Sequence, residues 1–373
     1  MNNNQYGFTK EHTKIAKGIA ILFMVYHHLF VIPERLNNDY VSVINLLGYN
    51  FQSVLANFAK ICVCIFVFCS GIGLYYSLIK ISSLRDMYKK VFVHGLKFML
   101  NFWIILLFVI PIGCGLNFFS INNFKGIFQL FTASNGNVME WWFIKQYIAL
   151  LILAPVVVRL FQNTKPIKKI IPIIIIIVIS FVLYRICTQY TFLNQGIFYH
   201  LFVFIQYIWS IDCVLAFFVG VLCARNNLIH HYQKHKGRDR WIVCLFSVLI
   251  AIVIRVFFSN TPTSMNFDFF VVPLFILPLV TVLYNTKIGK ILSFFGTHST
   301  NIWLTHTFWC YYFGQAIILL PRYSILIYIW LLFLSLLSSY IINLLYVPLS
   351  NLFFSKEHRL SYKGYLRIEK MKR

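Results

Sequence analysis

Long apolar segments separated by short polar ones run through most of the chain. Each segment approaches the roughly 20 residues that a helix needs to cross a lipid bilayer. The pattern predicts ten membrane-spanning helices, at residues 15–32, 54–79, 98–112, 142–161, 170–187, 201–224, 241–258, 268–284, 300–320 and 323–346. Segment 98–112 is short, and segment 268–284 contains two prolines, which neighbouring helices make tolerable inside a membrane. We therefore expect an all-α polytopic membrane protein with a lipid bilayer around it.

Composition leads to the same class of protein. Of the 373 residues, 60% are hydrophobic and only 12% are charged, which is too apolar for one water-soluble core. The first apolar segment has no small-residue cleavage site and is expected to stay as a helix. Connections between segments are short. We expect a single transmembrane domain over residues 1–350 and a short basic cytoplasmic tail over residues 351–373.

The net charge of +23 is explained by where the basic residues lie. Lys and Arg collect in the cytoplasmic connections of membrane proteins. With ten spans, 26 of the 33 basic residues fall on one side, in the amino-terminal segment, every second connection and the tail. Both termini are therefore expected in the cytoplasm, and nucleic acid is not expected as a partner. Arg185 and Arg255 fall near the opposite ends of spans, where they are expected to be outer-surface anchors.

Histidines inside the predicted spans are the candidates for chemistry. His27 and His28 lie in the first span, and His306 lies in the ninth. A neutral imidazole can take up a proton and return it, so a deep histidine can act as a general base. Adjacent residues on a helix point about 100° apart, so at most one of His27 and His28 is expected to face a reacting group. The alternative is that each histidine only hydrogen-bonds a neighbouring helix.

The spacing between Lys17 and His28 suits a site that begins at the membrane surface. His28 follows Lys17 by eleven residues, which is about 16 Å along a helix axis. Lys17 can therefore meet the cytoplasm while His28 lies deep in the membrane. Asp212, in the sixth span, can fix the tautomer of an imidazole or simply hydrogen-bond another helix.

The order of several motifs resembles the acyltransferase-3 family of integral membrane acyltransferases, many of which O-acetylate bacterial surface polysaccharides. In "KGIAILFMVYHH", Lys17 and His28 match the family's basic residue, ten intervening residues and histidine. Later segments are similar to family segments in the same order: "FVFCSGIGLYYS", "YKKVFVHGLKFMLNFW", "EWWFIKQYIALLILAP", "FFVG" and "FFGTHSTNIWLTH". Two features depart from the family pattern. Lysine replaces the more usual arginine at position 17, and no glutamate–proline pair follows the last helix.

The resemblance implies transfer of an acyl group, most simply acetyl, from cytoplasmic acetyl-CoA to a hydroxyl group. The acceptor would be a cell-surface or capsular polysaccharide or its lipid-linked precursor, and the location the bacterial cytoplasmic membrane. His28 would be the general base, with Lys17 and His306 as further catalytic residues. The candidates to hold CoA are Lys17, Lys89, Lys90 and Lys97, and those to contact the acceptor are Glu140, Trp142 and Tyr147. No metal is expected. The sequence does not separate direct transfer from a transient acyl group on His28, and the acceptor sugar, the position acylated, the acyl chain length, the side of the membrane on which the acceptor is modified and the oligomeric state stay open.

Other interpretations of the same residues remain. The lysines also serve as topology signals and lipid-headgroup contacts, and tryptophans at this depth commonly form an interfacial belt. The competing functions are a polysaccharide or glycolipid transporter or flippase, and a non-catalytic membrane scaffold. A transporter predicts an inverted repeat with broken helices at matching positions. The sequence has no internal similarity of that kind.

Overall fold

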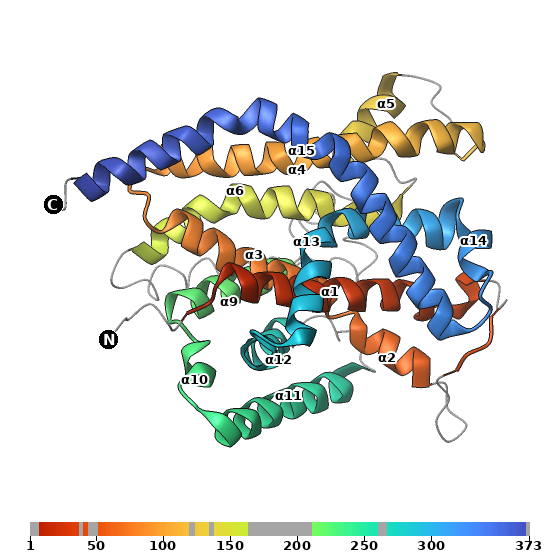
Figure 1. Cartoon of the computed structure of the whole chain (residues 1–373), viewed down its shortest axis with the longest axis horizontal. Coiled ribbons are helices and arrows are strands. Elements are labelled where there is room, and N and C mark those ends of the chain that lie inside the picture. Colours follow the sequence, from red (N-terminus) through yellow and green to blue (C-terminus); the bar gives the residue numbers. More distant parts are fainter. Residues whose placement is uncertain are drawn as a thin grey trace, which may run out of the picture.

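The computed structural model describes residues 7–36, 40–43, 51–118, 124–133, 138–162, 211–259 and 267–370. These residues form helices and no strands (Figure 1). One isolated β-bridge pairs Val41 with Tyr323. The helices are α1 (Lys10–Phe30), η1 (Pro33–Leu36), α2 (Phe51–Ala59), α3 (Cys62–Leu78), α4 (Leu84–Gly115), α5 (Phe124–Phe131), η2 (Met139–Trp141), α6 (Trp142–Gln162), α9 (Ile211–Arg225), α10 (His230–Gln233), α11 (Gly237–Ser259), α12 (Asp268–Leu283), α13 (Lys287–Thr307), η5 (Phe308–Tyr312), α14 (Gln315–Leu319) and α15 (Ser324–Lys370).

The described residues confirm an all-α membrane protein. Five stretches are long and apolar enough to span a bilayer: Phe51–Leu78, Leu84–Gly115, Trp142–Gln162, Gly237–Phe257 and Ser324–Phe354. A sixth arises if α12 and the following helix, bent by 119° at their junction, count as one span. The predicted span 170–187 and the first half of 201–224 lie outside the described residues. Ten spans therefore stay a prediction.

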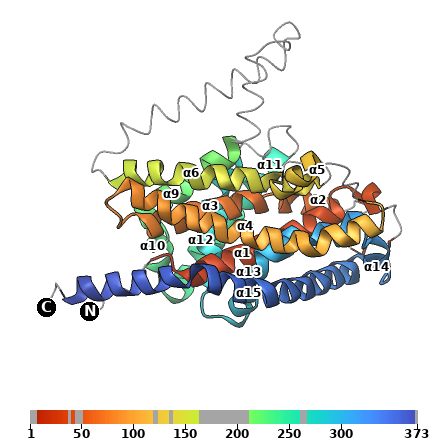
Figure 2. The same cartoon turned by 90° about the horizontal axis from the view of Figure 1, so that it is seen from above.

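The start of α1 and the end of α15 lie toward the same end of the helix bundle (Figures 1 and 2). This arrangement suits two termini on one side of a membrane, although the side itself stays a prediction. α15 is one helix from Ser324 to Lys370 and so continues across the predicted domain limit at residue 350.

α1 lies inside the bundle, where it packs against α2, α3, α12, α13 and α15. It begins at a capping box, in which Thr9 Oγ1 accepts the His12 N–H at 3.3 Å and His12 Nδ1 accepts the Thr9 N–H at 3.0 Å. α1 is not among the stretches that are long and apolar enough to span a bilayer. A helix enclosed by other helices needs no lipid-facing surface, so it can carry polar side chains at membrane depth.

α1 and α13 approach so closely that their backbones touch. A Cβ atom added to Gly18 would overlap the Leu292 carbonyl, and one added to Gly296 would overlap the Lys14 carbonyl. Figure 1 shows α13 crossing α1 near the centre of the molecule. Small residues allow such contacts, and they matter in membranes because lipid gives helices little hydrophobic reason to associate.

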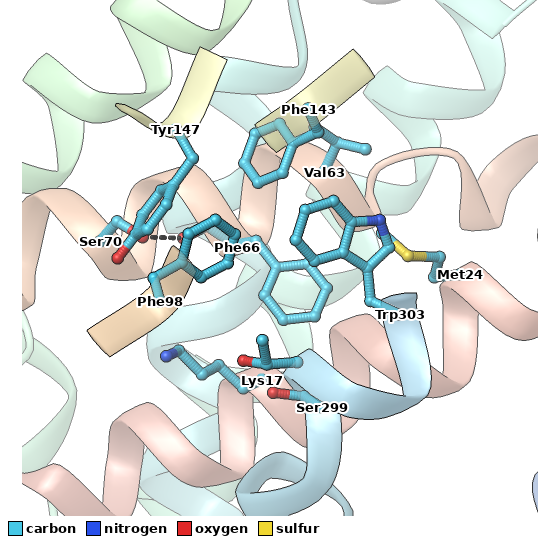
Figure 3. Close-up of a pocket in the computed structure, with 11 residues that line it drawn as sticks. Lys17, Met24, Val63, Phe66, Ser70, Phe98, Phe143, Tyr147, Ser299 and Trp303 are labelled. Atoms are coloured by element: carbon cyan, nitrogen blue, oxygen red, sulfur yellow. Dashed lines mark hydrogen bonds between the residues drawn. The ribbon is translucent and has the colours of Figure 1, made fainter. Parts of the chain in front are cut away.

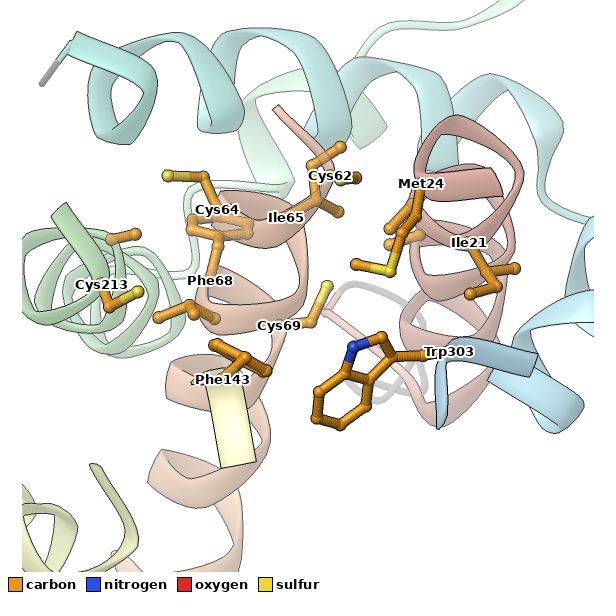
Figure 4. Close-up of a cluster of buried hydrophobic side chains, with 14 of the residues drawn as sticks. Ile21, Met24, Cys62, Cys64, Ile65, Phe68, Cys69, Phe143, Cys213 and Trp303 are labelled. Carbon is orange, nitrogen blue, oxygen red and sulfur yellow. The ribbon is translucent and has the colours of Figure 1, made fainter. Parts of the chain in front are cut away.

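α3 and α9 meet in the same way. A Cβ added to Gly71 would overlap the Phe217 carbonyl, and one added to Gly220 would overlap the Phe68 carbonyl. Both glycines belong to motifs that resemble family segments. A cluster of buried apolar side chains from α1, α3, α6, α9 and α13 lies around this contact (Figure 4). Within it, Cys62, Cys64 and Cys69 are free thiols that serve as small apolar side chains.

α13 begins earlier than the hydropathy pattern indicates. The predicted ninth span covers residues 300–320, whereas α13 starts at Lys287 after Thr286, whose Oγ1 accepts the Gly289 N–H at 2.9 Å. The part of α13 before residue 300 contains two Lys, two Ser, one Thr and one His, which hid it from a search for apolar segments. At its other end the helix changes to a single π-helical turn, η5.

We predict that Gly296→Val destabilises the protein by about 1–3 kcal/mol or more, because the added side chain must push α13 away from the α1 backbone. The measurement is the thermal unfolding midpoint of the purified protein in detergent. Gly115→Val is the matched control, because nothing lies within 4 Å of a Cβ placed at Gly115. Equal midpoints for the two variants would contradict the close α1–α13 contact.

Candidate functional site

Basic side chains from α1 and α4 line one wide pocket, here called the cationic pocket. It is partly open, has an empty volume of about 870 Å³, and is lined among others by Lys17, Lys90, His94, Lys97 and Tyr147. Three of the four lysines that the sequence suggests for CoA therefore meet here. The fourth, Lys89, does not line the pocket; its Nζ is exposed and lies 3.3 Å from Asp86 Oδ1.

His94 is a residue of this pocket that sequence reasoning missed. Its Nε2 and the Tyr147 hydroxyl are 2.8 Å apart, so the hydrogen bond ties α4 to α6. A signal was present in the sequence: Lys90, His94 and Lys97 are spaced by four and three residues, which places them on one face of a helix.

A second pocket continues from the first and is here called the amide pocket. It shares Lys17, His94, Lys97 and Tyr147 with the cationic pocket and adds three asparagines, Asn101, Asn301 and Asn343. These asparagines come from α4, α13 and α15 and form a chain of hydrogen bonds, of 2.6 Å between the first two and 3.1 Å between the last two. The sequence analysis did not identify them, because only the packing of three distant segments brings them together.

A third, largely apolar pocket also starts at Lys17 and Tyr147 and leads deeper. Its walls include Phe66, Phe98, Phe143, Met24 and Trp303. In Figure 3, Met24 and Trp303 lie on the opposite side of this pocket from Ser70 and Tyr147. The three pockets therefore adjoin one another around Lys17 and Tyr147.

Two histidines lie one helical turn beyond the end of the apolar pocket. His28 follows Met24 by four residues on α1, and His306 follows Trp303 by three on α13, so each shares a face with its partner in the pocket wall. The rings of His28 and His306 are 5.1 Å apart between centroids. The structure thus brings together two of the three residues that the sequence suggests for catalysis, with Lys17 at the other end of the pockets.

Hydrogen bonds define the tautomer of His306, which is fully buried. Its Nδ1 lies 2.9 Å from the Trp303 carbonyl and 3.0 Å from the Ile302 carbonyl. Carbonyl oxygens only accept, so Nδ1 carries the hydrogen and Nε2 keeps a lone pair. That Nε2 has no hydrogen-bond partner among the described residues. Backbone carbonyls, rather than Asp212, therefore orient this imidazole.

The two adjacent histidines of α1 have different surroundings. His27 Nδ1 donates to the Ala56 carbonyl at 2.8 Å and so binds α1 to the end of α2. His28 contacts the rings of His306 and Tyr311, and the Tyr311 hydroxyl donates to the His28 carbonyl oxygen. His27 is held by the scaffold, and His28 lies against the second histidine.

The π-helical turn η5 connects the histidines to an acidic residue. π-Helical turns are rare and occur frequently at functional sites. Next to Tyr311, Tyr312 donates its hydroxyl to Glu140 Oε2 at 2.7 Å, and Arg35 Nη1 lies 3.8 Å from Glu140 Oε1. The Arg35 guanidinium also sits over the Tyr311 ring, 5.0 Å from its centroid. This cluster of Arg35, Glu140, Tyr311 and Tyr312 is here called the outer cluster.

The structure separates the three residues suggested for the acceptor. Glu140 belongs to the outer cluster, whereas Tyr147 lines the pockets that contain Lys17. Trp142 is 38% exposed on the surface of the bundle, where it contacts the ring of Phe143. Of these three residues, only Glu140 therefore belongs to the outer cluster, which contacts His28 through Tyr311.

In the part of the chain that the structure describes, no three His, Cys, Asp or Glu side chains are grouped to hold a metal ion. The acyltransferase-3 family model, described as an acyltransferase domain, matches residues 14–344. The chain belongs to the acyltransferase-3 family. No curated protein and no solved structure matches it. Family membership, which the motifs predicted, is thus confirmed, and with it a membrane acyltransferase.

This acyltransferase has a second group of buried polar side chains, which contains Arg255. The expected position of Arg255 at the outer surface is therefore wrong. Arg255 is 2% exposed, and its Nε lies 2.7 Å from Oδ1 of the buried Asp268. Its Nη2 also donates to the Asn57 carbonyl at 3.4 Å. A charge near the end of a span needs a partner when other helices cover it, and here Asp268, at the start of α12, supplies that partner. Arg185 lies outside the described residues.

We predict that Asp268→Leu lowers the stability of the acyltransferase by about 3–5 kcal/mol, because Arg255 then stays buried without a counter-charge. The double variant Arg255→Met, Asp268→Leu should recover most of this loss, since apolar residues of similar size often replace a buried ion pair without cost. Thermal unfolding in detergent measures both. A double variant that is as unstable as the single one would contradict the pairing.

Proposed function

We propose that this protein transfers an acetyl group from cytoplasmic acetyl-CoA to a hydroxyl group of a cell-surface or capsular polysaccharide or its lipid-linked precursor. The membrane would be the bacterial cytoplasmic membrane. The observation that carries the proposal is a pair of adjoining pockets, which starts among lysines at Lys17 and ends one turn before the contact between His28 and His306.

The geometry of α1 supports a long, narrow donor. Lys17, Met24 and His28 are seven and four residues apart, so they follow one stripe of the helix. The stripe is about 16 Å long. CoA has an anionic head and a narrow arm that ends in the thioester. With its phosphates at Lys17, CoA would extend its arm along this stripe toward His28.

Charge in the cationic pocket supports the place of the CoA head. Lysine binds phosphate as a point charge, without the fixed fork of arginine, so Lys17 can replace the arginine that is usual in the family. Lys90 and Lys97 add two cations to the same pocket. We leave Lys89 out of this site, because it is paired with Asp86 at the surface.

The proposed reaction is direct transfer. The acceptor hydroxyl oxygen attacks the thioester carbon while His28 takes the hydroxyl proton. The carbon–sulfur bond then breaks, and the proton passes from His28 to the departing sulfur, which gives the ester and free CoA. The Nε2 lone pair of His306, in the ring next to His28, accepts the N–H of the charged His28 imidazole during this step. His306 would thereby stabilise the positive charge on His28.

The outer cluster supports the place of the acceptor. Glu140 and Tyr312 are already joined by a hydrogen bond, and Arg35 lies beside them, 39% exposed in its side chain. Carboxylate, hydroxyl and guanidinium groups provide both acceptors and donors for sugar hydroxyls. Because Tyr311 joins this cluster to the backbone of His28, a sugar bound there would approach the base from the side opposite CoA.

We predict that His28→Ala lowers acetylation of the surface glycan at least about 100-fold, the loss expected for removal of a general base. The measurement is the acetyl content of glycan from a deletion strain complemented with each variant, at matched membrane expression. His27→Gln is the control, because its amide can still donate to the Ala56 carbonyl; it should retain acetylation. Normal acetylation with His28→Ala would overturn the proposal and favour a transporter or a scaffold.

We also predict that Lys17→Met weakens the binding of CoA to the purified protein by about tenfold or more, because a charged hydrogen bond to phosphate is lost. Equilibrium binding of radiolabelled CoA in detergent measures the effect. Lys89→Met removes the same charge outside the pocket and should change the affinity less than about twofold. If the two variants bind CoA equally well, Lys17 does not hold the CoA phosphates.

A further inference from the structure

The amide pocket contains a polar atom whose role the proposed reaction does not explain. Asn101, on α4, is 6% exposed, and its Oδ1 is buried with no hydrogen-bond partner among the described residues. Its Nδ2, in contrast, donates to Asn301 Oδ1 at 2.6 Å. A buried amide oxygen without a donor costs free energy, so such a group calls for an explanation, and a bound ligand is one.

The neighbouring hydrogen bonds decide which end of Asn101 stays unpaired. Asn301 Nδ2 lies 3.5 Å from the Ser339 carbonyl on α15 and 3.1 Å from Asn343 Oδ1. A backbone carbonyl accepts only, so the amide nitrogen of Asn301 faces α15 and its oxygen faces α4. Asn101 must then present its own nitrogen to Asn301. The free oxygen of Asn101 therefore follows from the orientation that the Ser339 carbonyl favours for the Asn301 amide.

Asn101 lies at a defined depth between the two parts of the proposed site. It follows Lys97 of the cationic pocket by four residues on α4, which is one turn, or about 6 Å. Its partner Asn301 precedes His306 by five residues on α13, which is about 7.5 Å. Asn101 also lines the pocket that contains Lys17 and Lys97. The side chain of Asn101 thus lines a pocket that adjoins the proposed route at Lys17 and Tyr147.

The middle of CoA carries the complementary chemistry. Between its phosphates and its sulfur lies the pantetheine arm, which contains two secondary amides, each with one N–H donor. We propose that Asn101 Oδ1 accepts the N–H of one of these arm amides and makes the protein selective for amide-bearing thioester donors. Asn301, itself hydrogen-bonded to Asn343, holds Asn101 with its amide oxygen free to accept this N–H. The inference rests on the proposed use of CoA and assigns a residue that recognises the donor.

The test changes the ligand and the protein together. Binding of CoA and of two CoA analogues, each N-methylated at one arm amide, is measured on the full-length protein in lipid nanodiscs. The wild-type protein should bind one analogue at least about tenfold more weakly than CoA, because the methyl group removes the donor. Asn101→Leu should bind CoA as weakly as that analogue and should no longer distinguish the two ligands.

A matched control is Thr281→Val, which removes a buried hydroxyl on α12 that hydrogen-bonds within its own helix to Leu277. It should discriminate between the ligands as the wild type does.

Wild-type protein that binds CoA and both analogues equally would overturn the inference. Discrimination that survives in Asn101→Leu would also overturn it, because the methyl group would then act through a steric effect. Either result leaves CoA as the donor. Failure of the wild type to bind CoA at all would instead overturn the proposed function, and the inference with it. The comparison of ligands on wild-type protein does not depend on the folding of any variant.

Discussion

The backbone contact between α1 and α13 positions the rest of the site. At Gly18 and Gly296 no side chain separates the two helices, so each helix runs against the main chain of the other. From this crossing, α1 extends to His28 and α13 to His306, whose rings meet. In a bilayer, packing of small residues supplies an attraction that the hydrophobic effect does not. Because other helices enclose α1, its lysine and histidines also avoid the hydrocarbon.

The chemistry changes in steps along this pair of helices. Lysines and His94 surround one pocket, asparagine amides line a second beside it, and aromatic and aliphatic side chains of a third lead from Lys17 toward the histidines. Beyond the histidines, the π-helical turn η5 brings tyrosines against His28 and Glu140. A charged, amide-containing and then narrow donor fits the first side, and a hydroxyl-rich acceptor fits the second. The two substrates would therefore approach the base from opposite ends.

Sequence alone predicted the features that depend on local pattern. Apolar segments identified a helical membrane protein, the ordered motifs identified the family, and the spacing in α1 related Lys17 to His28. Features that depend on packing between distant segments were not predicted. The proposed role of Asn101 depends on its hydrogen bond to Asn301, which is distant in sequence. Arg255 was expected at the surface because its partner, Asp268, lies on another helix. The start of α13 was missed because an enclosed helix can be polar.

The most direct measurement is the structure of the protein with CoA bound in a lipid nanodisc. The proposed function predicts that density for the phosphates lies among Lys17, Lys90 and Lys97 and that the sulfur lies beside the rings of His28 and His306. A CoA molecule bound elsewhere, or one whose sulfur points away from the histidines into solvent, would contradict it.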